Sequence, residues 1–273
     1  MCRMLIAIGN VNMSEMIDGM IAMAKNLNSC HELNSNQPGS WTHGDGWGIA
    51  YLKGDKWIIS KSTKAIYNDE SLQRFRNIKT KAAIMHVRKQ SIGETSPENT
   101  HPFYENSINI GEVIFCHNGT IKSELSYSPE FIPKGQTDSE KLFYSILTNL
   151  KEKKLVDAVR NSLKKIDSAS GTNLILATKE MSLIAAKKSN YPRYYQMNLG
   201  KKEDLVIISS EIIPELKNLS WCPIEEGSII TLNHHTLQFS VHKEIKVIGQ
   251  RNPLRSRSYE PTNQSALLES IQV

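Results

Sequence analysis

The second residue of the chain is a cysteine, directly behind the leading methionine. Enzymatic removal of that methionine requires a small second residue, and cysteine is small enough, so we expect a mature chain that begins with the free α-amino group of Cys2. An α-amino group has a reference pKa of about 7.7–8.0 and a thiol one of about 8.5. At neutral pH the amine can therefore act as general base for a thiolate nucleophile on the same residue. Considered alone, a single cysteine is more often a small buried hydrophobe.

An arginine at a predicted strand end offers a second piece of chemistry. Arg88 closes the segment His86-Val87-Arg88, which follows an apolar run and precedes a polar loop that ends at residues 99–103. Its planar guanidinium group can donate two parallel N–H groups to a carboxylate, such as that of an amino-acid substrate. Without further context, an arginine in this position is an ordinary surface salt-bridge residue.

Two further positions could bind the charges of a reacting amide and its amino-acid part. The apolar segment 115–119 ends in Asn118-Gly119, where a side-chain N–H and a closely approached backbone N–H could form an oxyanion hole. The same dipeptide is also a common hairpin turn. Asp138 lies in the first turn of a predicted helix, where its carboxylate either complements the helix dipole or meets a substrate ammonium group.

The spacing of apolar residues predicts the elements that position these side chains. A capping box, with Thr137 as N-cap and Glu140 reaching back to it, should start the third helix. The segment 251–273 is typical of a loosely ordered tail or an arm against a partner. We predict strands at 2–8, 47–52, 56–61, 82–87, 112–116, 173–178, 182–186, 205–209, 228–233 and 237–242, and helices at 14–28, 69–77, 138–150 and 155–166.

Composition excludes several classes of protein. With 273 residues, the chain fits one large domain. It contains no run of about 18 apolar residues and no secretory leader, so neither membrane insertion nor export is indicated. A net charge of +5 on scattered lysines is weak support for nucleic-acid binding. The four cysteines are widely spaced, and His234 and His235 would point to opposite faces of a strand, so we expect neither a disulfide framework nor a metal site. The expectation is a cytoplasmic protein without a cofactor.

Taken together, five segments resemble, in order, the class II glutamine amidotransferase domain. The resemblance covers about residues 2–250, and the Asp-Gly-Trp-Gly form of the second segment is similar to the small stand-alone branch. It implies an α+β fold, the four-layer α/β/β/α sandwich of two antiparallel sheets found in N-terminal nucleophile (Ntn) hydrolases. The segments are Met-Cys-Arg-Met-Leu at the start, 44–51, 86–88 with 99–103, 115–119 and 137–140.

The resemblance also implies roles for matching residues. Cys2 would attack the γ-amide of glutamine and form a thioester, while Asn118 and Gly119 hold the oxyanion. Arg88 and Asp138 would bind the α-carboxylate and the α-ammonium group of the substrate.

Further residues of the matching segments receive supporting roles or none. His101 and Trp47 would shape the substrate site. We assign no acid–base role to His86, His101 or His117, because in this family the α-amino group does that work. Cys116 departs from the smaller residue that family members often carry before His-Asn-Gly, and it alters only strand packing.

Three functions remain open from the sequence. An amidotransferase would pass ammonia from glutamine to an acceptor, which we expect on a separate acceptor or synthetase subunit. An amidohydrolase would cleave another γ-glutamyl amide with the same residues, since these recognise the γ-glutamyl part and not the leaving group. A non-catalytic binding protein would keep the fold and retain Met1.

Overall fold

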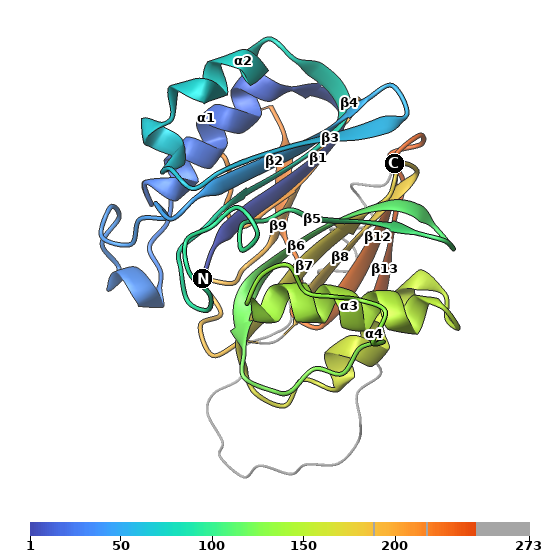
Figure 1. Cartoon of the computed structure of the whole chain (residues 1–273). Helices are drawn as coiled ribbons and strands as arrows, with labels where there is room; N and C mark the ends of the chain where they lie inside the picture. The colour runs from blue at the N-terminus through green and yellow to red at the C-terminus, as the bar shows by residue number, and fades with distance from the viewer. Residues whose placement is uncertain (188, 217, 244–273) are drawn as a thin grey trace, which may run out of the picture.

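Two antiparallel sheets pack face to face, and helices cover the outer face of each sheet (Figure 1). The computed structural model describes residues 1–187, 189–216 and 218–243 of the chain. The predicted α+β fold, a four-layer α/β/β/α sandwich, is confirmed.

The first sheet contains the start of the chain as a central strand. Its strands are β1 (Arg3–Asn12), β2 (Trp47–Lys53), β3 (Lys56–Ser62), β4 (Lys79–Val87), β9 (Asn198–Lys202), β10 (Leu205–Ser209) and β11 (Ser220–Pro223). They follow the order β11-β9-β10-β1-β4-β2-β3. Helices α1 (Met13–Ala24) and α2 (Gln73–Arg76) lie on the outer face of this sheet (Figure 1).

The second sheet carries the Asn118-Gly119 segment on a strand near its edge. Its strands are β5 (Phe103–Ser107), β6 (Gly111–Ile121), β7 (Ala169–Ala177), β8 (Met181–Lys187), β12 (Ser228–Asn233) and β13 (Phe239–Lys243). They follow the order β13-β12-β8-β7-β6-β5. Helices α3 (Asp138–Leu150) and α4 (Leu155–Lys164) cover its outer face (Figure 1), and short 3₁₀ turns occur at Glu32–Asn34, Ile66–Asn68 and Glu70–Leu72.

Alternate side chains of a strand point to opposite faces of its sheet, which divides the core into three apolar layers. The layer between the sheets contains even-numbered residues of β1, β4 and β6, such as Met4, Ile84 and Ile114. Odd-numbered residues of β1 and β4, such as Leu5 and Met85, pack on the helix side of the first sheet together with residues of α1. A third layer joins the second sheet to α3 and α4. This alternation decides which side chains can meet between the sheets.

The methionine stripe of helix α1 packs against the first sheet. Met16, Met20 and Met23 are fully buried in the layer that joins α1 to the first sheet. The side chain of Asn12 caps the helix by accepting a hydrogen bond from the Ser14 amide at 3.1 Å. The stripe is therefore a core-facing surface.

The predicted capping box of α3 is only half formed. The Thr137 hydroxyl accepts a hydrogen bond from the Glu140 amide at 3.2 Å, as expected for an N-cap. Glu140 does not reach back to Thr137; its carboxylate instead accepts hydrogen bonds from the amides of Lys134 and Gly135, both at 2.9 Å. The preceding turn supplies two donors and so competes successfully for this carboxylate.

Strand β6 is longer than the sequence predicted, and β5, β9 and β11 were not predicted. The expected turn at Asn118-Gly119 is wrong: β6 continues to Ile121, because Asn118 pairs with Asn173 and Gly119 with Thr172 on β7. Of the three short strands, β5 and β11 are edge strands, with little apolar alternation to reveal them.

The predicted tail at 251–273, and the domain boundary at 250, lie outside the residues that the structure describes. Within the described residues, no helix combines the length and the apolar character needed to cross a membrane.

Candidate active site

The strand alternation directs the candidate side chains into the same layer. Cys2 precedes β1 and has the parity of Met4, which lies between the sheets. His86 shares the parity of its β4 neighbours between the sheets, and Asn118 that of the neighbouring residues of β6. Since β4 and β6 belong to opposite sheets, this end of the inter-sheet layer brings His86, Asn118 and Cys2 together.

Asn118 forms the direct link between the two sheets at this end. The Cys2 amide nitrogen donates a hydrogen bond to the Asn118 side-chain oxygen at 2.8 Å. Because the nitrogen is a donor, the side-chain amide must present its oxygen to it, and its NH₂ group points elsewhere. That Nδ2 atom is buried and has no hydrogen-bond partner. A buried donor without a partner is unusual, and here it is available to an added acceptor.

Gly119 follows Asn118 at a point of close backbone approach. A β-carbon at Gly119 would lie 1.9 Å from the Gly171 carbonyl oxygen on β7. No side chain larger than hydrogen fits there, so glycine is required by packing, and the expected hairpin turn plays no part.

The Cys2 thiol is poised to ionise near neutral pH. Burial raises the pKa of this thiol, but the positive N-terminal ammonium group on Met1 and the neighbouring His86 imidazole outweigh burial and lower its pKa to about 6. The Met1 ammonium group donates to the Lys89 carbonyl oxygen at 2.9 Å. By contrast, burial raises the pKa of the Cys116 thiol in the inter-sheet layer, so this thiol is inert.

Arg88 is a buried cation whose ionic partner is missing. Its side chain is 3% exposed, and its guanidinium donates to the carbonyl oxygens of Ile92, Gly93 and Glu94 at 2.9–3.1 Å. Burial lowers the pKa of Arg88, opposed by the charges of Cys2 and Asp45. Within the described chain no carboxylate forms an ion pair with it. Buried charges are normally paired, so the group is suited to a ligand carboxylate.

Asp138 is the matching buried anion. One of its oxygens accepts a hydrogen bond from the Ile121 amide at 2.5 Å. Burial raises the pKa of Asp138, opposed by this backbone contact and, more weakly, by the N-terminal ammonium group. In the residues described, no cationic side chain forms an ion pair with it. Arg88 and Asp138 thus provide one unpaired charge of each sign close to the chain start, as an amino acid requires.

Two motifs of the sequence hold these charges in place. The Arg88 amide donates to the Gly46 carbonyl oxygen at 2.8 Å, and the Asp45 amide donates to the Arg88 carbonyl oxygen at 3.0 Å. Asn99 donates to the Glu94 carbonyl oxygen at 3.0 Å and accepts from the Gln136 amide at 2.8 Å. Asn99 therefore ties the loop around Arg88 to the turn that leads into α3.

His101 lies against the site wall, whereas Trp47 does not reach the site. The His101 ring packs on His86 with centroids 4.2 Å apart, and burial lowers the pKa of His101, so the ring is neutral. Trp47 has odd parity, so its indole points to the helix side of the first sheet and donates to Asp69 at 3.0 Å. The expectation that Trp47 shapes the substrate site is therefore wrong. Alternation along β2 would have revealed this.

A buried polar network beneath Cys2 was not predicted. The Tyr194 hydroxyl donates to the Cys2 carbonyl oxygen at 3.1 Å and lies 3.0 Å from His43 Nε2. Since the hydroxyl has one hydrogen, His43 Nε2 must donate to it. Arg3 stacks on the Tyr194 ring at 4.0 Å, donates to its carbonyl oxygen at 2.7 Å and pairs with Glu211 at 2.7 Å. The sequence signal for this network was Arg3, a charged residue inside an apolar run.

These contacts contain no metal centre. Among the described residues, no group of three or more His, Cys, Asp or Glu side chains is arranged to hold a metal ion. The chemistry available at this end of the sandwich is that of a thiolate, an amide donor, a backbone N–H and two opposite charges.

Sequence comparison identifies related proteins. An uncharacterized protein of Methanocaldococcus jannaschii is 34% identical over 140 residues, which cover 50% of this chain and 39% of that protein. A predicted glutamine amidotransferase of Haemophilus influenzae is 27% identical over 222 residues, which cover 69% of this chain and 73% of the relative. The chain thus spans well under half of the first relative.

Solved structures share the fold at low identity. Glutamine phosphoribosylpyrophosphate amidotransferase from B. subtilis, solved with ADP and GMP, has a TM-score of 0.63 at 18% identity and matches 89% of this chain and 49% of its own. A class-II glutamine aminotransferase domain protein of Silicibacter pomeroyi has a TM-score of 0.58 at 14% identity and matches 89% of this chain and 99% of its own. These structures establish the sandwich as the Ntn-hydrolase fold.

The family itself follows from the match to a family model. The model described as "Glutamine amidotransferases class-II" matches residues 13–190. This range begins after Cys2 and includes Arg88, Asn118 and Asp138. With most of its length matched and its fold shared, the chain belongs to the class II glutamine amidotransferases.

Proposed function

We propose that this chain hydrolyses the side-chain amide of glutamine through a thioester on Cys2, after Met1 has been removed. The position of Asn118 carries the proposal. Its side-chain oxygen holds the Cys2 nitrogen at 2.8 Å, while its amide nitrogen is buried without a partner. One side chain thus orients the nucleophile-bearing residue and keeps a donor free for an oxyanion. Membership of the class II amidotransferases supports the same chemistry.

Removal of Met1 converts the Cys2 nitrogen from an amide into a primary amine. Asn118 Oδ1 can still accept one hydrogen of this amine, which holds the nitrogen next to the thiol of the same residue. An amide nitrogen cannot accept a proton, whereas the amine can take the thiol proton and return it later.

The reaction then follows in balanced steps. The Cys2 thiolate attacks the carbonyl carbon of the glutamine γ-amide, and the carbonyl oxygen becomes an oxyanion that accepts hydrogen bonds from Asn118 Nδ2 and the Gly119 N–H. The Cys2 ammonium group gives its proton to the leaving nitrogen, the C–N bond breaks and ammonia departs. Water, deprotonated by the amine, attacks the thioester, and glutamate and the thiol are released.

Recognition would rest on the charges that lack partners. Arg88 binds the α-carboxylate and Asp138 the α-ammonium group, which completes both buried ion pairs. The same pair would accept any γ-glutamyl amide, so glutamine and a γ-glutamyl thiol compound must be compared directly. His101 supports the wall formed by His86.

Transfer of the ammonia would need an acceptor, which we assign to a separate subunit in the cytoplasm. The match covers 49% of the B. subtilis enzyme, so the part of such an enzyme that uses the ammonia would lie outside the matched region. Addition of that subunit should raise glutamine turnover.

The test compares three preparations whose N-termini are checked by intact mass. The first has a free Cys2 terminus, the second carries a leucine inserted between Met1 and Cys2 to prevent methionine removal, and the third is Cys2→Ala. We expect glutamine hydrolysis only in the first, with a loss of at least about 10²-fold in the second because the general base is missing. Cys30→Ala, at an exposed cysteine, is the matched control and should keep the parent rate.

Two results would overturn the proposal. Equal turnover with and without the inserted leucine would eliminate the terminal amine as base. Turnover by Cys2→Ala near the parent rate would eliminate the nucleophile. A folded chain with a confirmed free Cys2 that hydrolyses neither glutamine nor the γ-glutamyl thiol compound would instead support the non-catalytic alternative.

A further inference from the structure

A cavity of about 610 Å³ opens at the end of the sandwich opposite to Cys2. Strand β4 runs from Lys79 at this cavity to Val87 beside Arg88, and Lys81 also lines the cavity. From Lys81 to Arg88 an extended chain spans about 23 Å at about 3.3 Å per residue. The cavity is therefore separate from the candidate active site.

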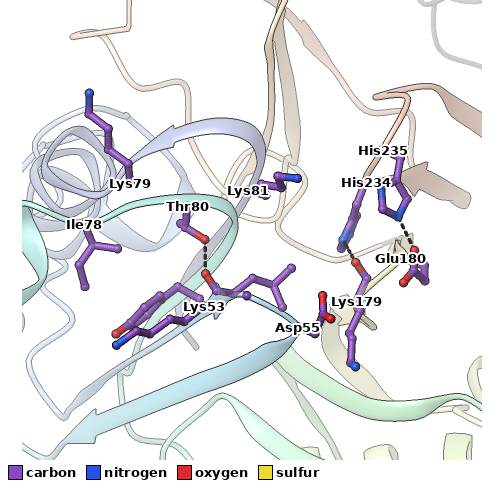
Figure 2. A pocket seen from close by; sticks show the side chains of 13 residues that line it. Lys53, Asp55, Ile78, Lys79, Thr80, Lys81, Lys179, Glu180, His234 and His235 are labelled. Carbon is purple, nitrogen blue, oxygen red and sulfur yellow. Dashed lines mark hydrogen bonds and ion pairs between the residues drawn. The ribbon is translucent and has the colours of Figure 1, made fainter.

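Both sheets contribute to this cavity, which we call the lysine pocket. The first sheet supplies the turn between β2 and β3 and the start of β4, and the second supplies the turn after β7 and the turn between β12 and β13. Figure 2 shows Ile78, Lys79 and Thr80 on one side and Lys179 and His234 on the other. A ligand in the pocket would contact both sheets at once.

Unpaired positive charge dominates the lining. Lys53, Lys79, Lys81 and Lys179 line the pocket, and in the described part of the chain none of their ammonium groups forms an ion pair or hydrogen bond. Two carboxylates also line it, those of Asp55 and Glu180. The lining therefore holds four lysine ammonium groups against two carboxylates, and this excess of positive charge at one concave surface favours an anion.

The histidines and one carboxylate are already engaged. His234 and His235 lie in the turn after β12 and not in a strand as predicted. His234 donates to the Lys179 carbonyl oxygen at 2.8 Å and accepts from Ser182 at 2.6 Å. Burial lowers the pKa of His234 to about 4, so it is neutral. His235 pairs with Glu180 (Figure 2), which leaves Asp55 as the unengaged carboxylate of the lining.

The pocket also has an apolar wall. Tyr51, Leu52 and Ile78 line it next to the lysines. Tyr51 is held by an edge contact with Phe75, with ring centroids 6.3 Å apart. A cationic rim beside a fixed aromatic and aliphatic wall suits a ligand that has an anionic group and a flat or apolar part.

We propose that the lysine pocket binds a small organic phosphate, whose phosphate lies among Lys79, Lys81 and Lys179 and whose apolar part lies against Tyr51 and Ile78. The lining cations are all lysines. Lysine binds phosphate as a compact point charge, whereas planar carboxylates favour the fork of arginine, so this set favours phosphate. The volume is also in the range of small-molecule sites, about 300–1,000 Å³. This site is independent of the proposed hydrolysis.

The experiment uses three probes that separate charge from apolar contact. AMP has a phosphate and a ring, pyrophosphate has charge without a ring, and adenosine has a ring without charge. Titration calorimetry on the full chain should give at least tenfold tighter binding of AMP than of adenosine or pyrophosphate. The affinity for AMP should fall when salt is raised, because the lysines are exposed.

A pair of double variants tests the location. Lys79→Glu with Lys81→Glu reverses two charges of the pocket, and binding of AMP should weaken at least tenfold. Lys141→Glu with Lys164→Glu makes the same charge change on exposed positions of α3 and α4 and should bind AMP like the parent. All four sites are exposed, so circular dichroism should show the parent fold in both proteins.

Three outcomes would overturn the proposal: no binding of AMP or pyrophosphate at millimolar concentration, adenosine binding as tightly as AMP, or equal weakening in both double variants. Glutamine hydrolysis is measured on the same preparations. Because the pocket lies at the opposite end from Cys2, we expect the variant with Lys79→Glu and Lys81→Glu to lose AMP binding and to hydrolyse glutamine at the parent rate. Failure of the AMP result would leave the proposed hydrolysis standing, and the reverse also holds.

Discussion

Substitution of Asn118 by leucine should remove catalysis while leaving stability nearly unchanged. Asn118 Nδ2 is the proposed oxyanion donor, and loss of one such donor costs about 2.7–4 kcal/mol in the transition state, or about 10²–10³-fold in kcat. KM should change little, because the ground-state carbonyl does not make this contact. Leucine has nearly the same shape and adds no charge beside the Cys2 thiolate.

Two buried polar groups determine the effect on the free energy of unfolding. The substitution removes the acceptor of the Cys2 N–H, and a buried donor left without a partner costs about 1–3 kcal/mol. It also removes Asn118 Nδ2, which is itself buried without a partner and so carries a cost of the same order. The two terms oppose one another, and the net change should be near zero.

The assay combines steady-state glutamine hydrolysis with urea unfolding. Asn173→Leu provides the matched control on the neighbouring strand, since Asn173 pairs with Asn118 in the register and donates to the Tyr195 carbonyl oxygen at 2.6 Å. That control should lose stability and keep kcat within tenfold. A kcat for Asn118→Leu within tenfold of the parent, in a folded protein, would refute the oxyanion role.

Three further results follow from the site. Arg88→Ala and Asp138→Ala should each raise KM for glutamine by about 30-fold or more, because one substrate charge stays unpaired in a buried site, and unchanged KM values would rule out the clamp. In the chain that carries Met1, burial raises the Cys2 pKa but the Met1 ammonium group and His86 lower it to about 6, so its thiolate is lost as pH falls through 6. With Cys30→Ala as background, alkylation of Cys2 in that chain by iodoacetamide should be half-maximal near pH 6; a midpoint near 9 would contradict this electrostatic account. Tyr194→Phe should lower kcat at constant KM and reduce stability by about 1–3 kcal/mol, measured by urea unfolding, since the Cys2 carbonyl loses its donor.

Much of the fold could be predicted where the sequence pattern is local. The hairpin of β2 and β3, the capped start of α3 and the methionine stripe of α1 all follow from turn residues and apolar spacing. The edge strands β5 and β11 could not be predicted, because their pairing depends on neighbours distant in the sequence. The same reason explains Asn118-Gly119: a local turn preference yields to a continuous ladder with β7.

The sequence proposes the members of the candidate site but not their geometry. Resemblance to a family pointed to Cys2, Arg88, Asn118 and Asp138. Asp138 comes from the first turn of α3, whereas strand parity places Cys2 and Asn118 between the sheets. It also excludes Trp47, whose parity could have been read from the alternation of β2. The contacts of Tyr194 with Cys2 span 192 residues, and no local pattern reports such a distance.

The long reach of the first strand has a consequence during synthesis. Strand β1 is made about 200 residues before its partner β10 and before the Glu211 carboxylate that pairs with Arg3. Such distant pairing makes folding wait for nearly the whole chain. The first sheet therefore gains the hydrogen bonds between β1 and β10, and Arg3 gains its ion pair, only after residue 211 has been made.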